Sequence, residues 1–212
     1  MTNYIKYPRT MHLPWSEGIT DDDKVIESLS EFIGKRVIVT EKMDGENTSM
    51  YRDHIHARSI DSKNHDTRNW VKNFWSHIKN DIMEELRVCG ENVYAKHSIH
   101  YKNLPSYFMG ISVWNGDVCL TWDATLFWFT HLKIVPVPVL YDGIYDEKKI
   151  KALWKKLKST ECEGYVIRIA DQFNYNEFNK KVAKFVRKNH VQTDEHWMHG
   201  KKIEKNILTS NL

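Results

Sequence analysis

A lysine, an aspartate and a glycine follow a short apolar run in the stretch EKMDGEN at residues 41–47. The preceding run, VIVT, is rich in β-branched residues and predicts a buried strand. Alone, the spacing of Lys42, Asp44 and Gly45 fits a solvated lysine before an Asp-Gly turn. It also fits a lysine nucleophile at a strand end, where the turn lets the backbone approach a phosphate closely. The choice between these interpretations depends on residues further along the chain.

Three more charged clusters follow in order. They are Gly90-Glu91, the stretch EGYVIR that begins at Glu163, and the basic run KKVAKFVR at 180–187. A free lysine is almost wholly protonated at neutral pH and cannot attack a phosphate. Its pKa must be lowered by desolvation and by nearby positive charge. The basic run can supply that charge, and a bound Mg²⁺ ion can add to it.

Together these elements resemble the covalent nucleotidyltransferase superfamily of polynucleotide ligases and mRNA capping enzymes, and its RNA ligase branch most closely. The resemblance extends from about Lys6 to Arg187. Order and spacing make it specific, although each element alone would be weak. The matching residues are Lys42-Met43-Asp44-Gly45, Arg58-Ser59, Gly90-Glu91, Phe108 in SYFMGISVWN, Glu163 to Arg168, and the basic run around Lys184.

The resemblance implies that Lys42 attacks the α-phosphate of ATP, forms a lysyl-AMP and releases pyrophosphate. It implies that Glu91 binds the ribose hydroxyls, and that Glu163 orients Lys42 or holds Mg²⁺ (or Mn²⁺) through water. Arg58 would bind a ribose or a 5′-phosphate, Phe108 would stack on adenine, and the backbone around Glu41 would read the adenine edge. The expected nucleotide-binding residues are Glu41, Lys42, Asp44, Gly45, Arg58, Glu91, Phe108, Glu163, Lys181 and Lys184, of which Lys42, Glu163 and Lys184 are catalytic.

The basic run departs from the family pattern. The family has two lysines on one face of the strand, with one residue between them. Here position 186, which shares a face with Lys184, is a valine. Either Lys184 acts alone, or a bulge brings Lys181 or Arg187 to the phosphates. We expect Lys184 to be the main contact.

Periodicity and turn signals predict short antiparallel strands interleaved with helices, which is an α+β fold. We expect an adenylation domain of antiparallel sheets flanked by helices at residues 1–189, a short tail or cap at 190–212, and no OB domain. Helices are predicted at 21–34, 66–86, 122–133 and 146–158. Strands are predicted at 36–43, 47–53, 54–60, 88–98, 106–115, 117–121, 163–170 and 180–187.

Composition fits this interpretation. The 212 residues are 41% hydrophobic and 28% charged, with a net charge of +3, as in a globular chain that handles phosphates. Three cysteines without CxxC spacing indicate reduced thiols, and no apolar run predicts a membrane span. We expect a cytoplasmic monomer whose partners are ATP, Mg²⁺ and RNA ends.

Other functions stay open at this point. A DNA ligase or a GTP-using capping enzyme shares the motifs, although the residues after Arg187 are too few for the OB barrel that most of them carry. A non-catalytic nucleic-acid-binding module would need no amine nucleophile. The tail also contains His190, His196 and His199, for which a zinc site is the weaker hypothesis and a polynucleotide contact the stronger one.

Overall fold

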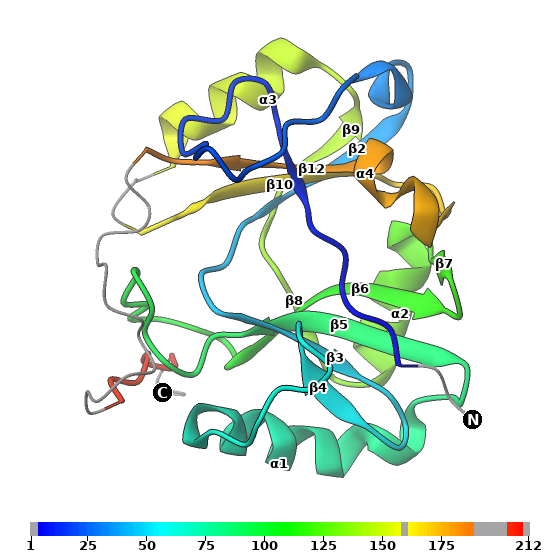
Figure 1. The fold of residues 1–212 in the computed structure, drawn as a ribbon, viewed down its shortest axis with the longest axis vertical. Coiled ribbons are helices and arrows are strands. Elements are labelled where there is room, and N and C mark those ends of the chain that lie inside the picture. Colours follow the sequence, from blue (N-terminus) through cyan, green and yellow to red (C-terminus); the bar gives the residue numbers. More distant parts are fainter. Residues whose placement is uncertain (1–3, 158–160, 189–202, 210–212) are drawn as a thin grey trace.

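The computed structural model describes residues 4–157, 161–188 and 203–209. Two sheets lie at different levels of the molecule, with α3 beyond one sheet and α1 beyond the other (Figure 1). No helix in the described ranges is long and apolar enough to cross a membrane. The helices are α1 (Asn69–Ile78), α2 (Trp122–His131), α3 (Glu147–Leu153) and α4 (Phe178–Lys181). The strands are β1 (Met11–His12), β2 (Arg36–Glu41), β3 (Glu46–Met50), β4 (Ile55–Ala57), β5 (Leu86–Asn92), β6 (Phe108–Asn115), β7 (Val118–Cys119), β8 (Val135–Pro136), β9 (Val139–Ile144), β10 (Gly164–Ile169), β11 (Phe173–Asn174) and β12 (Val182–Val186).

The first sheet has the strand order β1-β12-β10-β2-β9. Its central strand β10 pairs antiparallel with β2 on one side and with β12 on the other. The β-branched residues Val37, Ile38 and Val39 of β2 have no exposed surface, which fits a strand covered on both faces. This pairing brings the end of β2, the start of β10 and the C-terminal half of β12 together.

The second sheet has the order β11-β7-β6-β5-β3-β4, and β8 pairs with β6. Helices α1 and α2 cover its outer face, where Val71, Ile78 and Phe129 pack against Val88 and Val113. The strand β4 lies at the edge of this sheet and has only three residues. The predicted α+β fold of antiparallel sheets flanked by helices is therefore confirmed.

The predicted helix at 21–34 is wrong. Only Ser30–Phe32 form a short 3₁₀ turn in this stretch. The side chain of Asp23 accepts hydrogen bonds from the amide and hydroxyl of Thr20 and from Arg9, and such local side-chain bonds compete with helix formation. Ile26 and Phe32 still pack in the core, so their spacing reflected burial rather than helical periodicity.

Residues 203–209 pack beside the segment 94–104. Asn206 is 1% exposed, and its side chain donates to the carbonyls of Val93 and Ala95 and accepts from the amide of Tyr101. Lys96 and Glu204 form an ion pair at 2.7 Å. The domain boundary near residue 190 stays a prediction, because residues 189–202, with the three tail histidines, lie outside the described residues.

Candidate active site

A cleft of about 750 Å³ lies where the ends of β2 and β3 meet β5, β10 and β12. Its wall brings together residues that are far apart in the sequence and that the sequence motifs predict to bind one nucleotide. Those predicted residues are Glu41, Lys42, Gly45, Arg58, Glu91 and Lys184. The cleft is therefore the candidate active site.

Lys42 follows β2, and its backbone amide donates to the carbonyl of Gly164 at 2.9 Å. Its Nζ donates to a carboxylate oxygen of Glu163 at 2.6 Å. The Glu163 side chain is only 7% exposed, whereas that of Lys42 is 26% exposed and lines the cleft. The strand pairing thus places an amine at the cleft surface and a buried carboxylate directly behind it.

The electrostatics of Lys42 differ from the expectation. Burial alone would lower the pKa of Lys42, but the negative charges of Glu163 and Glu91 outweigh it, so this pKa is raised. The predicted lowering by positive charge is therefore not present in the free protein. Lys42 rests as an ammonium, and its proton must leave before the nitrogen can attack.

Glu91 and Lys184 complete the charged lining. Burial raises the pKa of Glu91 to about 8, with Lys42 opposing the shift and Glu163 adding to it. Burial and then the positive charge of Lys42 lower the pKa of Lys184. Lys184 Nζ lies 3.9 Å from Asp23 Oδ1. Perturbed groups of both signs in one cleft are typical of a catalytic site.

Asp44 and Gly45 shape the turn after Lys42. The Asp44 carboxylate accepts bonds from the amides of Ser98 and Ile99 at 2.8 and 2.9 Å, and it does not line the cleft. A Cβ on Gly45 would meet the carbonyl oxygen of Asn92 at 2.5 Å, so only glycine fits. Asp44 is thus placed as a turn anchor rather than as a nucleotide ligand.

Two predicted residues lie elsewhere. Phe108 has no exposed surface and packs near Phe74 of α1 in the core under the second sheet, so no face of its ring is open to adenine. Lys181 ends α4 instead of standing on a strand, and its Nζ pairs with Glu177 at 2.8 Å. Of the two lysines, only Lys184 lines the cleft, and its role as the main phosphate contact stays a prediction.

The apolar part of the cleft escaped prediction. It is lined by Ile111, Val137 and Val166. Cys89 pairs with Ser112 and Gly90 with Gly110, so Ile111 is the extra residue of a β-bulge, a feature that can re-aim a side chain. Val166 lies in the matched motif EGYVIR and pairs with Lys184 on β12, so strand alternation could have indicated it.

Of three N-terminal residues that could border the cleft, Arg9, His12 and Trp15, only Arg9 lines it. The cleft is also lined by His97, which no sequence pattern indicated. His12 is 1% exposed and its Nδ1 lies 2.8 Å from the hydroxyl of Ser16. Trp15 donates to the hydroxyl of Tyr165. Neither His12 nor Trp15 lines the cleft.

The carboxylates suit a hard divalent cation. Glu163 and Glu91 present oxygen ligands, the kind that Mg²⁺ and Mn²⁺ prefer. Within the described ranges, no group of three or more His, Cys, Asp or Glu side chains converges on one point. An ion would therefore need phosphate and water oxygens in addition to Glu163.

Comparison with known proteins identifies a family and several similar folds. The family model for RNA ligase matches residues 35–186. An archaeal ATP-dependent RNA ligase matches with a TM-score of 0.58 and 13% identity, over 86% of this chain and 48% of that one. An RNA ligase of Naegleria gruberi with AMP and Mn matches with a TM-score of 0.54 and 17% identity, over 88% of this chain and 57% of that one. A putative ATP-dependent DNA ligase from Aquifex aeolicus matches with a TM-score of 0.54 and 18% identity, over 86% of this chain and 50% of that one.

The chain belongs to the RNA ligase family, a family of ATP-dependent ligases. It spans between about half and three-fifths of the length of the three solved structures above. At these identities the structural likeness shows the fold alone. No curated protein matches the chain.

Proposed function

We propose that the chain is an ATP-dependent RNA ligase that works through a lysyl-AMP on Lys42. The observation that carries this proposal is the 2.6 Å contact between Lys42 Nζ, which lines the cleft, and the buried carboxylate of Glu163 behind it. A nucleic-acid-binding module would gain nothing from an amine held against a proton acceptor at a strand end. Family membership supports the same reaction class.

In the first step, Lys42 Nζ forms a bond to the α-phosphorus of ATP while the bond from that phosphorus to the bridging oxygen breaks. Pyrophosphate leaves along that line. Glu163 is the nearest acceptor for the lysine proton. Lys184, which faces the cleft, stabilises the negative charge on the phosphate oxygens.

Two further steps complete the sealing. The 5′-phosphate of one strand attacks the lysyl-AMP phosphorus, which releases Lys42 and leaves AMP on the strand end in a pyrophosphate linkage. The 3′-hydroxyl of a second strand then attacks the 5′-phosphate, which forms the new phosphodiester and expels AMP. Arg58 lines the cleft with no hydrogen bond or ion pair to other described residues, so its guanidinium is available to a strand phosphate.

The adenine would lie against Ile111 and Val166, which take the place that we had assigned to Phe108. Glu91 would accept hydrogen bonds from the ribose hydroxyls. Glu163, with the nucleotide phosphates, would hold Mg²⁺ or Mn²⁺. When bound, such an ion supplies positive charge that neutralises the phosphates.

The test is incubation with α-labelled ATP or GTP and Mg²⁺, read as label on denatured protein. We expect label from ATP with the wild type and none with Lys42→Ala. Label from GTP would indicate a capping enzyme instead. A folded wild type that takes no label, and whose mass shows no AMP already bound, would contradict the proposal.

A DNA ligase is the second candidate, favoured by the likeness to the Aquifex aeolicus protein. The two are separated by offering 5′-adenylylated RNA and DNA strands of one sequence to the unlabelled protein. We expect faster sealing of the RNA strand. Equal or faster sealing of DNA would reverse the assignment.

A further inference from the structure

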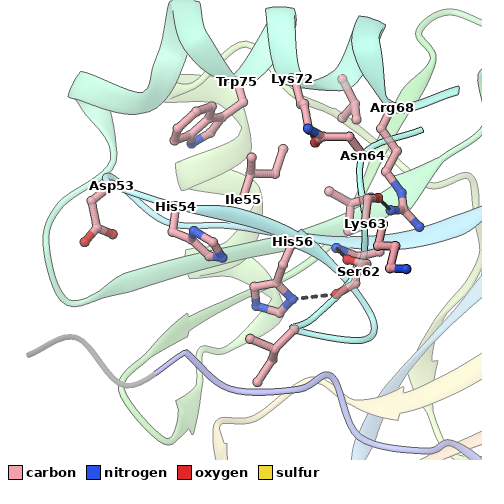
Figure 2. Close-up of a pocket in the computed structure, with 14 residues that line it drawn as sticks. Asp53, His54, Ile55, His56, Ser62, Lys63, Asn64, Arg68, Lys72 and Trp75 are labelled. Atoms are coloured by element: carbon pink, nitrogen blue, oxygen red, sulfur yellow. Dashed lines mark hydrogen bonds between the residues drawn. The ribbon is translucent and has the colours of Figure 1, made fainter. Parts of the chain in front are cut away.

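A second cavity, which we call the α1 pocket, lies between α1, the edge strand β4 and the loop that joins them (Figure 2). Its volume is about 380 Å³, within the range of small-ligand sites. Figure 2 shows Lys72 and Trp75 projecting from α1 toward the strand that carries Ile55. The size suits one nucleotide rather than a folded strand.

The α1 pocket has an apolar floor and a basic rim. Ile55, Val71 and the indole of Trp75 form the floor, while Lys63 and Lys72 stand on the rim. Asp53 also lines the pocket, at the end away from Lys63 (Figure 2). Lys72 Nζ donates to the amide oxygen of Asn64, a neutral partner. Among the described residues, neither lysine has a carboxylate partner. A flat apolar surface beside two uncompensated ammonium groups complements a base and its phosphate.

The α1 pocket shares a wall with the active-site cleft. Ala57 lines the α1 pocket and the next residue, Arg58, lines the cleft. Glu46 lines the cleft, and Arg68 of the α1 pocket donates to its carboxylate at 2.6 Å. A strand that leaves the cleft past Arg58 therefore reaches the α1 pocket by passing around the edge of β4.

We propose that the α1 pocket binds one unstacked nucleotide of the RNA strand whose end occupies the cleft. The inference rests on the proposed function and adds a strand-binding subsite to it. The base packs on the Trp75 side, and the flanking phosphates contact Lys63 and Lys72. The charge of Arg68 is already neutralised by Glu46, so Arg68 is not assigned a phosphate contact. Its ion pair with Glu46 forms part of the wall between the two cavities.

The test compares Lys63→Glu/Lys72→Glu with a matched control, Lys148→Glu/Lys155→Glu. The control makes the same charge change at two exposed lysines on the α3 side that line neither cavity. Lysyl-AMP formation without RNA should stay within about twofold in both variants. RNA binding, measured by fluorescence anisotropy at fixed salt, should weaken at least tenfold in the first variant and about twofold or less in the control.

A scan with single abasic nucleotides then tests occupancy by a base. Wild-type binding should weaken about tenfold at one position near the strand end, consistent with loss of one stacked base. Equal losses in both charge variants, or a flat abasic scan, would overturn the inference. So would saturation of adenylylated protein by free AMP at the concentrations at which RNA saturates it, because the occupant would then be a free nucleotide.

Failure of the proposed function gives a different result. A wild type that forms no lysyl-AMP contradicts the ligase, while the anisotropy and abasic measurements still report on the α1 pocket. Normal lysyl-AMP formation with RNA binding unchanged in Lys63→Glu/Lys72→Glu contradicts the α1 pocket alone.

Discussion

The contact between Lys42 and Glu163 decides the chemistry at the scale of single residues. A carboxylate at 2.6 Å keeps the lysine protonated and yet is the acceptor that must take its proton. These roles fit together if substrate binding draws charge away from Glu163. The free protein would then hold its nucleophile in an inactive state until ATP arrives.

Replacing Glu163 by Gln tests this balance. Loss of the negative charge removes the main cause that raises the pKa of Lys42, so that pKa should fall. The acid limb of kcat/KM for lysyl-AMP formation, which reports groups of the free enzyme, should therefore move to lower pH. The maximum rate should drop at least tenfold because the proton acceptor is lost. An unchanged acid limb would show that Glu163 does not control the lysine.

Glu91 gives a prediction about stability. Its pKa lies near 8 in the folded protein, against an ordinary value of 4.5. Between these values the folded state binds a proton that the unfolded state has lost, so the free energy of unfolding falls as pH rises through this window. The slope is at most about 1.4 kcal/mol per pH unit.

Glu91→Gln removes this pH dependence of the free energy of unfolding, because glutamine does not titrate. Relative to the wild type, the variant should become progressively more stable from about pH 4.5 to pH 8. Urea unfolding across this range gives the measurement, with Glu27→Gln, at an exposed position that does not line the cleft, as the control. Parallel stability curves for Glu91→Gln and wild type would contradict the raised pKa.

Two strands hold the catalytic pair at the scale of elements. A Cβ on Gly164 would lie 2.0 Å from the carbonyl oxygen of Phe185, so β10 and β12 can pair here only without a side chain. Gly164→Ala should push the strands apart and lower the free energy of unfolding by about 2 kcal/mol or more. It should also slow lysyl-AMP formation, since Glu163 and Lys184 flank this point.

The control for Gly164 is Gly116→Asn. Gly116 has φ +54° and nothing within 4 Å of an added Cβ, and asparagine tolerates this backbone conformation. Denaturant unfolding should show a change below about 1 kcal/mol for this variant. A Gly164→Ala protein as stable and active as wild type would contradict the close packing of β10 on β12.

The C-terminal segment reaches the active site through hydrogen bonds. Asn206 binds the amide of Tyr101, and the hydroxyl of Tyr101 accepts from the amide of Asp44 at 2.9 Å. Asn206→Ala should therefore lower the free energy of unfolding by about 2 kcal/mol and slow lysyl-AMP formation. Ile207→Ala, at a half-exposed neighbour, should do neither. Equal behaviour of the two variants in unfolding and labelling assays would contradict this role.

The α+β class, the positions of most strands and the charged motif residues could be predicted from the sequence, because polar residues at the ends of apolar runs stand out. Lys42, Glu91, Glu163 and Lys184 stand out in this way, and the resemblance to the ligase superfamily predicts their roles. The order of the strands within the two sheets could not be predicted, because it joins segments far apart in the chain. The prediction that Phe108 stacks on adenine did not account for which face of β6 it occupies. The bulge at Ile111 determines which side chains of this strand face the cleft, and no pattern in the sequence indicates a bulge there. The contacts of Asn206 join residues about one hundred positions apart, which no local pattern can indicate.

At the scale of the whole molecule, the cleft draws its walls from both sheets. Lys42 and Lys184 come from the β2 end and β12, whereas Glu91 and Ile111 come from β5 and β6. A nucleotide in the cleft therefore contacts both sheets at once. Ligand binding should couple them and stabilise the folded chain as one unit.

Thermal unfolding with ATP measures this coupling, and Lys42→Arg is the protein to use because it keeps the positive charge but cannot form the covalent adduct. A ligand at one hundred times its Kd adds about 2.7 kcal/mol to the free energy of unfolding. For a chain of this size, that corresponds to a rise in Tm of about 5 to 10 °C. Lys184→Ala combined with Lys42→Arg should need more ATP for the same rise, because a phosphate contact is lost. If millimolar ATP leaves the Tm of Lys42→Arg unchanged while GTP raises it, the apolar part of the cleft holds guanine and the protein is no ATP-dependent ligase.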